Sequence, residues 1–423
     1  MKTMLRITVL LLLCLVLCLG QTAFAEGSSI TIPNATELIE NEAFAGCSGI
    51  SALRIPSSVK RIGVGAFSGC SGLQDVYYYG TQQGWNAINI GTNNEPLIQA
   101  TLHFVDTQGF IRIDSTNFPD ANFQSYVAGS LDSDKDGWLS PTEISAVTRI
   151  ECYRMGISSL KGVEYFTELT YLNCSQNNLS ALDVRSNTKL QTLALYDNDI
   201  SSLDVSKNTE LQTLSCGEIY DGGVHGNKLS ALDVTHNTEL TQLVVSGNQL
   251  SSLNLINNTK LQILFCVQNN IGSLDLSHNK ELVRLLCYSN PITSLNLDQN
   301  TKLQILYCGD CGLTSLNLSG NTALRRVNVS ANNSLSSLTL GSKQNLEMLW
   351  VQNTNLSSLN ISNCPVISAA YNQGTRTDFG RYGQQFDNGD WYGYKLGEGL
   401  NPDSSDPVSH CQFCVDKKTS VTA

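Results

Sequence analysis

The stretch LQTLALYDNDISSLDVSKN, residues 190–208, decides the fold. It contains the pattern apolar-x-x-apolar-x-apolar-x-x-Asn twice, ending first at Asn198 and then at Asn208. Alternation of apolar and other residues over a few positions is the period of a short strand with one buried face. The pattern returns along the chain, mostly at intervals of 21 residues, with its first leucine at Leu190, Leu211, Leu240, Leu261, Leu282, Leu303, Leu324 and Leu346. One such unit cannot bury its own leucines, so the repetition predicts coils stacked around a continuous core.

Two further columns follow from the repeat. The asparagines tolerate turn geometry and can bond backbone groups of neighbouring coils, which predicts two asparagine ladders. A set of cysteines takes the position that Leu195 or Val245 fills in sister repeats, namely Cys174, Cys216, Cys266, Cys287 and Cys308. We expect them to pack inward as small apolar side chains and not to form a metal or redox array.

The pattern resembles the bacterial 21-residue leucine-rich repeats of the IRREKO type, over about residues 157–367. The resemblance implies a mainly β solenoid of about ten coils with two short strands each. The chain departs from the pattern at Cys311 and Thr354 in the first ladder and at Lys343 and Cys364 in the second. An insertion at residues 217–226 comes directly after a predicted strand, which would place it at the rim of the concave face.

A second kind of repeat precedes the first. Ala43-Phe44-x-x-Cys47 recurs 23 residues later as Ala66-Phe67-x-x-Cys70. It resembles the BspA-like family of leucine-rich-repeat surface proteins, and the similarity covers about residues 29–105. Cys47 and Cys70 should pack inside their coils.

Between the two repeat blocks lies the sequence DSDKDGWLSPTE, residues 132–143, which has the spacing of an EF-hand calcium loop. Calcium prefers six or seven oxygen ligands, and Gly137 would permit the sharp turn between them. The predicted ligands are the carboxylates of Asp132, Asp134, Asp136 and Glu143, the backbone carbonyl of Trp138, and Ser140 directly or through water. Apolar residues on both sides suit short flanking helices. We expect a single Ca²⁺ in a structural role, with a plain acidic turn as the alternative.

If Leu264 and Cys266 point inward, their neighbours on the same strand must point outward. Applied to each coil, this rule predicts an apolar, aromatic and cationic face in the second half of the solenoid. It comprises Ile263, Phe265, Val267, Arg284, Leu286, Tyr288, Ile305, Tyr307, Arg326, Met348 and Trp350. Exposed patches of this kind are typical of interaction sites. The alternatives are that these side chains only pack on one another or that the C-terminal segment covers them.

The N-terminal residues and the net charge limit the possible cellular compartment and the possible classes of partner. Residues 1–25 have Lys2 and Arg6, an apolar run and the site Ala23-Phe24-Ala25, which predicts a cleavable secretory signal and no membrane span. The formal net charge of -11 disfavours nucleic acid and anionic membranes as partners. The scattered histidines form no catalytic constellation. For His410-Cys411-x-x-Cys414, a local disulfide or two inert thiols are favoured over a zinc or thioredoxin-like site.

These observations predict a secreted or surface-associated, non-enzymatic protein that recognises an extracellular protein. A glycan-binding module and a passive structural protein of the cell envelope are the alternatives. The predicted domains are the signal (1–25), the BspA-like repeats (26–105), the calcium segment and N-terminal cap (106–156), the solenoid (157–370) and a C-terminal cap or tail (371–423). A strand near Val415 should cover the last coil.

Overall fold

The computed structural model describes residues 27–34, 36–105, 109–220, 222–373, 375–379, 391–395 and 413–423. The predicted signal and Cys411 lie outside the described residues. The chain forms two compact units. The first comprises Met1–Ile113 and Val127–Glu143, and the second comprises Asp114–Tyr126 and Ile144–Ala423.

A parallel sheet in the order β1-β3-β5-β7 forms one side of the first unit, and the shorter strands β2, β4 and β6 pair on another. The core between them includes Leu53, Phe67 and Val76, all fully buried. Phe44 and Phe67, from successive repeats, stack with ring centroids 5.2 Å apart. Of the two repeated cysteines, Cys70 is buried and Cys47 is half-buried. The strands are β1 (Ser28–Thr31), β2 (Leu38–Ile39), β3 (Ile50–Pro56), β4 (Arg61–Ile62), β5 (Asp75–Tyr79), β6 (Asn89–Ile90) and β7 (Thr101–Phe104), and the helices are α2 (Gln82–Asn86) and α3 (Glu95–Gln99).

The segment around the predicted calcium loop is partly helical. Helix α4 (Ala121–Ser130) precedes the loop, and α5 (Pro141–Ala146) begins at its end. Strand β8 (Ile111–Arg112) pairs antiparallel with β9 (Trp138–Leu139), which lies inside the loop sequence. The division between the two units falls within both helices.

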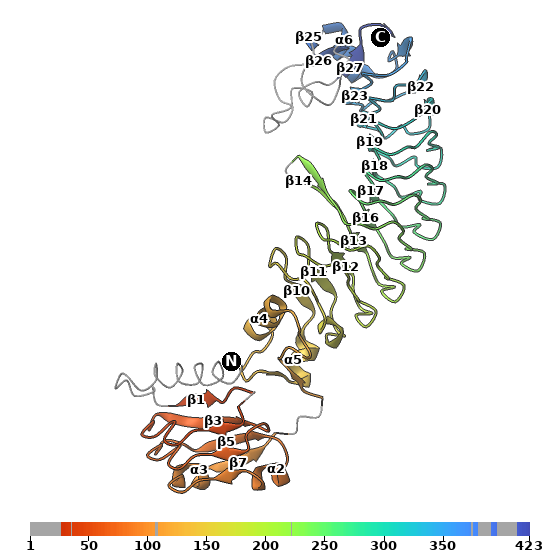
Figure 1. Ribbon diagram of the computed structural model, residues 1–423. Coiled ribbons are helices and arrows are strands. Elements are labelled where there is room, and N and C mark those ends of the chain that lie inside the picture. The colour runs from red at the N-terminus through yellow and green to blue at the C-terminus, as the bar shows by residue number, and fades with distance from the viewer. Residues whose placement is uncertain are drawn as a thin grey trace. The chain divides into compact units, whose positions relative to one another are not determined.

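In the second unit, ten coils contribute one strand each to a 13-stranded sheet, and the C-terminal segment contributes the other three strands. The register of the coil strands pairs like positions, such as Leu264 with Leu285. The predicted mainly β leucine-rich-repeat solenoid is therefore confirmed. Figure 1 shows the strands rising along one side of this unit. A 3₁₀ helix, η1 (Val163–Tyr165), lies in the first coils. The parallel strands are β10 (Arg149–Glu151), β11 (Tyr171–Asn173), β12 (Thr192–Ala194), β13 (Thr213–Ser215), β16 (Gln242–Val244), β17 (Ile263–Phe265), β18 (Arg284–Leu286), β19 (Ile305–Tyr307), β21 (Arg326–Asn328) and β23 (Met348–Trp350).

Both predicted asparagine ladders are present. In the first, Asn269 Nδ2 donates to the carbonyl of Val245, one coil earlier, at 2.9 Å, and its Oδ1 accepts from Leu250 N at 3.0 Å. In the second, Asn258 Nδ2 donates to the carbonyls of Val234 and Asn237 at 3.0 and 2.9 Å. These side chains link each coil to the one before it. The predicted cysteine column is also inward, since all five of its members are fully buried.

The second stretch of each repeat differs from the prediction of two strands per coil. Among the described residues it is a paired strand only in the later coils, as β20 (Ser315–Asn317), β22 (Ser337–Thr339) and β24 (Ser358–Asn360). In earlier coils the carbonyl that ends the stretch, such as that of Val234, accepts from an asparagine side chain of the next coil. Side-chain hydrogen bonds there supply the connection that a second sheet would make.

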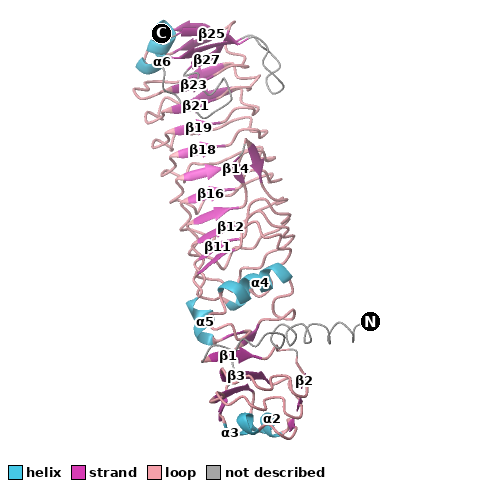
Figure 2. Ribbon diagram, turned by 90° about the vertical axis from the view of Figure 1, so that its left-hand side faces the viewer, coloured by secondary structure: helices cyan, strands magenta, loops and turns pink. Residues whose placement is uncertain are grey.

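The insertion and the tail are both β structures. The insertion forms an antiparallel hairpin of β14 (Glu218–Tyr220) and β15 (Gly223–His225), which projects from the strand side of the solenoid (Figures 1 and 2). After helix α6 (Pro365–Gln373), strands β25 (Thr375–Phe379), β26 (Trp391–Lys395) and β27 (Phe413–Asp416) extend the sheet from β23. Strand β28 (Ser420–Thr422) pairs with β24. The strand expected near Val415 is β27, and it covers the last coil.

Candidate calcium loop and ligand face

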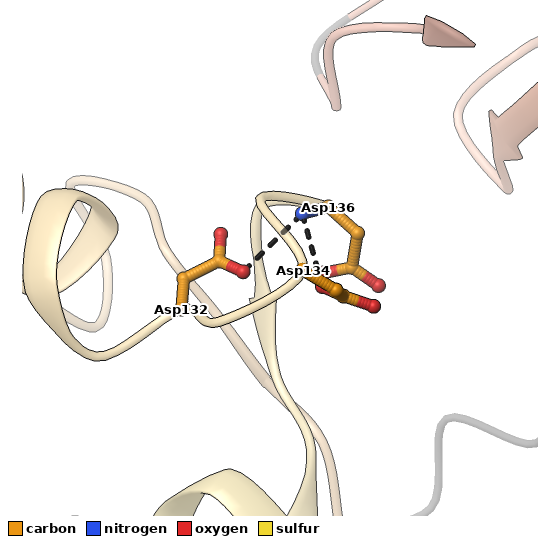
Figure 3. A group of neighbouring side chains, drawn as sticks. All are labelled: Asp132, Asp134 and Asp136. Carbon is orange, nitrogen blue, oxygen red and sulfur yellow. Dashed lines mark hydrogen bonds between the residues drawn. The ribbon is translucent and has the colours of Figure 1, made fainter. Parts of the chain in front are cut away.

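Three carboxylates of the predicted calcium loop converge (Figure 3). Asp132, Asp134 and Asp136 each offer one oxygen, and these three oxygens lie within 4.8 Å of one another. The loop is held by its own backbone, because Asp136 N donates to Asp132 Oδ1 and Asp134 Oδ1, both at 3.2 Å. Gly137 N donates to Asp132 Oδ2 at 3.0 Å. Gly137 has a φ of 84°, so glycine suits the turn that aims the carboxylates inward.

The electrostatics of the three carboxylates fit a bound dication. Asp132 and Asp136 are only 2% and 5% exposed. Burial, together with the charges of Asp136 and Asp134, raises the pKa of Asp132 to about 6, and burial also raises the pKa of Asp136. No lysine or arginine among the described residues forms an ion pair with any of the three. Asp134 is exposed. Neighbouring carboxylates that repel one another and form no ion pair with a lysine or arginine are a suitable oxygen donor set for Ca²⁺.

Glu143 lies apart from this group and closes the loop. Its Oε1 accepts from the backbone N and hydroxyl of Ser133 at 2.7 and 2.6 Å, and its Oε2 accepts from the N and hydroxyl of Ser140, both at 2.9 Å. Burial would raise the pKa of Glu143, but these hydrogen bonds outweigh it and lower that pKa. The ligand roles predicted for Glu143, Ser140 and the carbonyl of Trp138 therefore stay predictions.

Three residues distant in sequence contact the loop, and no motif in the sequence predicted them. The Tyr79 hydroxyl donates to Asp136 Oδ2, Asn34 bonds to both Gly137 and Trp138, and Arg112 lies over the Trp138 ring. Asn34 and Asp136 are far apart in the chain, and no spacing rule connects them. The tyrosine run 77–79 was the only available signal, and it is equally typical of an exposed strand.

On the inner sheet of the second unit, side chains alternate as predicted. Leu264, Leu285 and Leu306 are fully buried, whereas Phe265 and Tyr307 are partly exposed. The outward positions Ile263, Ile305, Arg326 and Trp350 are also partly exposed, and Arg284 is exposed. Leu286 and Met348 point to the same face but are only 9% and 8% exposed, because neighbouring side chains cover them. The structure thus brings most of the predicted ligand face together on β17, β18, β19, β21 and β23.

Contacts between coils organise this face. The rings of Tyr307 and Trp350 stack with centroids 6.3 Å apart, and the Tyr307 hydroxyl lies 3.8 Å from Met348 Sδ. The Arg284 guanidinium lies 5.4 Å from the Phe265 ring centroid. Arg326 Nε donates to a carboxylate oxygen of Glu347 at 3.0 Å. Some of the apolar area is therefore already used between coils, while Phe265, Tyr307 and Trp350 remain partly exposed.

Val267 is a correction to the predicted face. It is fully buried. Strand β17 ends at Phe265, so the inward and outward alternation stops there, and the chain then turns through Gln268, which has a φ of 51°. Ser246, at the same position one coil earlier, is fully buried as well, whereas Tyr288, one coil later, is half-buried. Val267 packs between coils and offers no surface to a ligand.

Comparisons with known proteins agree with this architecture. Residues 16–90 match the family model described as BspA type leucine-rich repeat region (6 copies). Internalin J from two strains of Listeria monocytogenes is 33% and 32% identical over 97 residues, which is 23% of this chain. The matched part spans about a tenth of the length of those relatives, 10% and 11%.

Two solved structures are similar over longer stretches. The functional domain of Internalin J from Listeria monocytogenes, described as including a cysteine ladder, matches with 26% identity and a TM-score of 0.35, covering 61% of this chain and 69% of that one. A leucine-rich-repeat protein of Leptospira interrogans matches with 15% identity and a TM-score of 0.41, covering 83% and 93%. None of the helices in the described part of the chain has both the length and the hydrophobicity of a transmembrane helix. The repeat register and the asparagine ladders show a leucine-rich-repeat fold, and part of the chain is similar in sequence to leucine-rich-repeat proteins of bacteria.

Proposed function

We propose that this chain is an exported, non-enzymatic recognition or adhesion protein that binds an extracellular protein through the outward side chains of β17 to β23. The observation that carries the proposal is the column Phe265, Tyr307 and Trp350, which is flanked by Arg284 and Arg326. Aromatic and arginine side chains are enriched at the centres of protein interfaces. The sequence relationship to internalins is consistent with a surface role.

The test removes the aromatic column. We expect the triple variant Phe265→Ala, Tyr307→Ala and Trp350→Ala to lose at least about tenfold in affinity for its partner, because each lost anchor of this type commonly costs more than about 1 kcal/mol. The partner is first captured from the native surroundings with the mature chain, then purified and measured by surface plasmon resonance. A matched control replaces two outward threonines of the same sheet, Thr192→Ala and Thr213→Ala, on β12 and β13.

The outcomes separate the candidate functions. Loss of binding with an unchanged circular dichroism spectrum supports recognition through this face. If the triple variant fails to fold, the three rings are needed for the structure of the solenoid. The affinity of the single variant Phe265→Ala for the partner then shows whether this face also contributes to binding. Retention of the wild-type chain on a glycan column, with no protein partner, would favour the polysaccharide-binding alternative.

We also propose that residues 132–143 bind one Ca²⁺ in a structural role. Asp132, Asp134 and Asp136 would each supply one oxygen ligand to the ion, and the remaining predicted ligands lie in the same loop. The metal would supply positive charge to this group of carboxylates. Extracellular calcium is millimolar, so weak affinity suffices for a structural site.

Removing the metal should weaken the loop. We expect EDTA to lower the unfolding temperature of the wild-type chain, because a ligand that binds only the folded state stabilises it by mass action. The paired variant Asp132→Asn and Asp134→Asn should not respond to EDTA, as measured by scanning calorimetry. If EDTA lowers the unfolding temperature of both proteins equally, the calcium that it removes binds elsewhere in the molecule.

A further inference from the structure

We propose that Tyr79 and Asn34, in the N-terminal repeat block, are positioning residues of the calcium loop, so that metal binding and the order of that block are thermodynamically coupled. This inference rests on the proposed calcium site. It extends that site from a local loop to a connection within the first unit.

Tyr79 holds one side of the loop. It is the last residue of β5 and is only 6% exposed. Its hydroxyl donates to Asp136 Oδ2, while Asp136 Oδ1 accepts from Trp138 N at 2.8 Å. Both oxygens of this carboxylate therefore accept a hydrogen bond, and one of the two donors, Tyr79, lies outside the loop.

The ring of Tyr79 makes a second contact with the loop. It stacks on the indole of Trp138 with centroids 6.1 Å apart and an angle of 4° between the rings. Trp138 is the residue whose carbonyl is predicted to ligate calcium. One tyrosine therefore restrains two of the positions whose oxygens must converge on the ion.

Asn34 holds the backbone between those two positions. Its Nδ2 donates to the carbonyl of Gly137 at 3.1 Å, and its Oδ1 accepts from Trp138 Nε1 at 3.1 Å. The backbone carbonyl of Asn34 accepts from the hydroxyl of Ser58 at 2.7 Å, which ties it to the next coil of the block. A Cβ on Gly137 would lie 2.8 Å from Asn34 Nδ2, so the close approach requires glycine.

The consequence is reciprocal coupling. Groups that orient metal ligands from outside the coordination sphere commonly change metal affinity by about 10- to 100-fold when removed. Thermodynamic linkage is reciprocal. If contacts from the repeat block increase the affinity for calcium, bound calcium must stabilise the ordered state of the repeat block by the same free energy. Tyr79 lies in register with Pro56 of β3, so this order should spread into the four-stranded sheet.

The experiment measures affinity and order separately, on the full mature chain. Calcium binding is titrated by isothermal calorimetry and by terbium luminescence sensitised by Trp138 in the wild type, Tyr79→Phe, Asn34→Ala and the control Tyr77→Phe. Tyr77 lies on the same strand, and its ring stacks on that of His103. We expect Tyr79→Phe and Asn34→Ala to weaken binding about tenfold or more and Tyr77→Phe to leave it unchanged.

Hydrogen exchange provides the second readout. Calcium should slow exchange in β3 and β5 of the wild type and do so less in Tyr79→Phe, a change that a merely structural tyrosine would not produce. If the wild type binds neither calcium nor terbium, the proposed calcium site itself fails, and this inference fails with it. If the wild type binds and both variants bind within about twofold of it, only the coupling is overturned. Should Tyr79→Phe not fold, Asn34→Ala decides the question by the same criterion.

Discussion

At the scale of single residues, Asp120 shows how one carboxylate can organise a helix start and a coil together. It is 9% exposed. Its Oδ1 accepts from Asn122 N and Phe123 N at 2.9 and 3.0 Å, at the start of α4. Its Oδ2 accepts from the backbone N and hydroxyl of Ser158 at 2.8 and 2.7 Å. Burial would raise the pKa of Asp120, but these donors outweigh it and hold that pKa below its ordinary value of 3.8.

A lowered pKa makes the contribution of Asp120 depend on pH. The stabilisation is fully present above the unfolded pKa of 3.8 and is lost as the pH falls through the folded pKa, because the folded state then gains the proton that the unfolded state already holds. We expect Asp120→Ala to reduce the free energy of unfolding at pH 7 by about 2 kcal/mol, through loss of the cap and of the bonds to Ser158. Urea unfolding at pH 7 and pH 3 checks this, and the gap to wild type should narrow at pH 3. The control Asp298→Ala, at an exposed site, should have the same free energy of unfolding as the wild type at both pH values.

At the scale of elements, the structure explains why the ladders survive their substitutions. Lys343 replaces an asparagine of the second ladder, is fully buried, and donates from Nζ to the carbonyl of Leu318 at 2.8 Å. Thr354 replaces an asparagine of the first ladder. Asp416 in β27 accepts from Asn353 N at 2.8 Å and from Thr354 N at 2.9 Å. The terminal strand thus supplies an acceptor for backbone donors of the coil that it covers.

We therefore expect Asp416→Ala to loosen the C-terminal end of the solenoid and little else. The buried N–H of Thr354 and the half-buried N–H of Asn353 would lose their acceptor, and the buried donor alone costs about 1 to 3 kcal/mol. In a repeat protein the effect should stay near the altered coil. Hydrogen exchange should become faster in β23, β27 and β28 and remain unchanged in β11 to β13. Lys418→Ala, an exposed change two residues away, serves as the control. Uniformly faster exchange along the sheet would contradict this local role.

At the scale of the whole molecule, the two compact units differ in how they are held. The second unit is a stack in which each coil contacts its neighbours through the sheet register and the ladders. The first unit combines a repeat block with residues 127–143, so a segment outside the repeats belongs to its fold. The domain boundaries predicted from the repeats and the sequence motifs remain predictions, but this division falls inside the calcium segment and not at either of its ends.

The sequence by itself determined the solenoid, the two ladders, the inward cysteine column and the alternation that exposes Phe265 and Tyr307. These are periodic features, and periodicity is visible in one dimension because each coil meets the same neighbours. Only the tertiary structure decided three other features. These are the end of the alternation at Val267, the single strand in most coils, and the hydrogen bond from Thr354 to Asp416. The tertiary structure also decided the convergence of Tyr79 and Asn34 on the calcium loop. Such contacts join segments that share no repeat, and chain folding brings them together without leaving a regular spacing in the sequence.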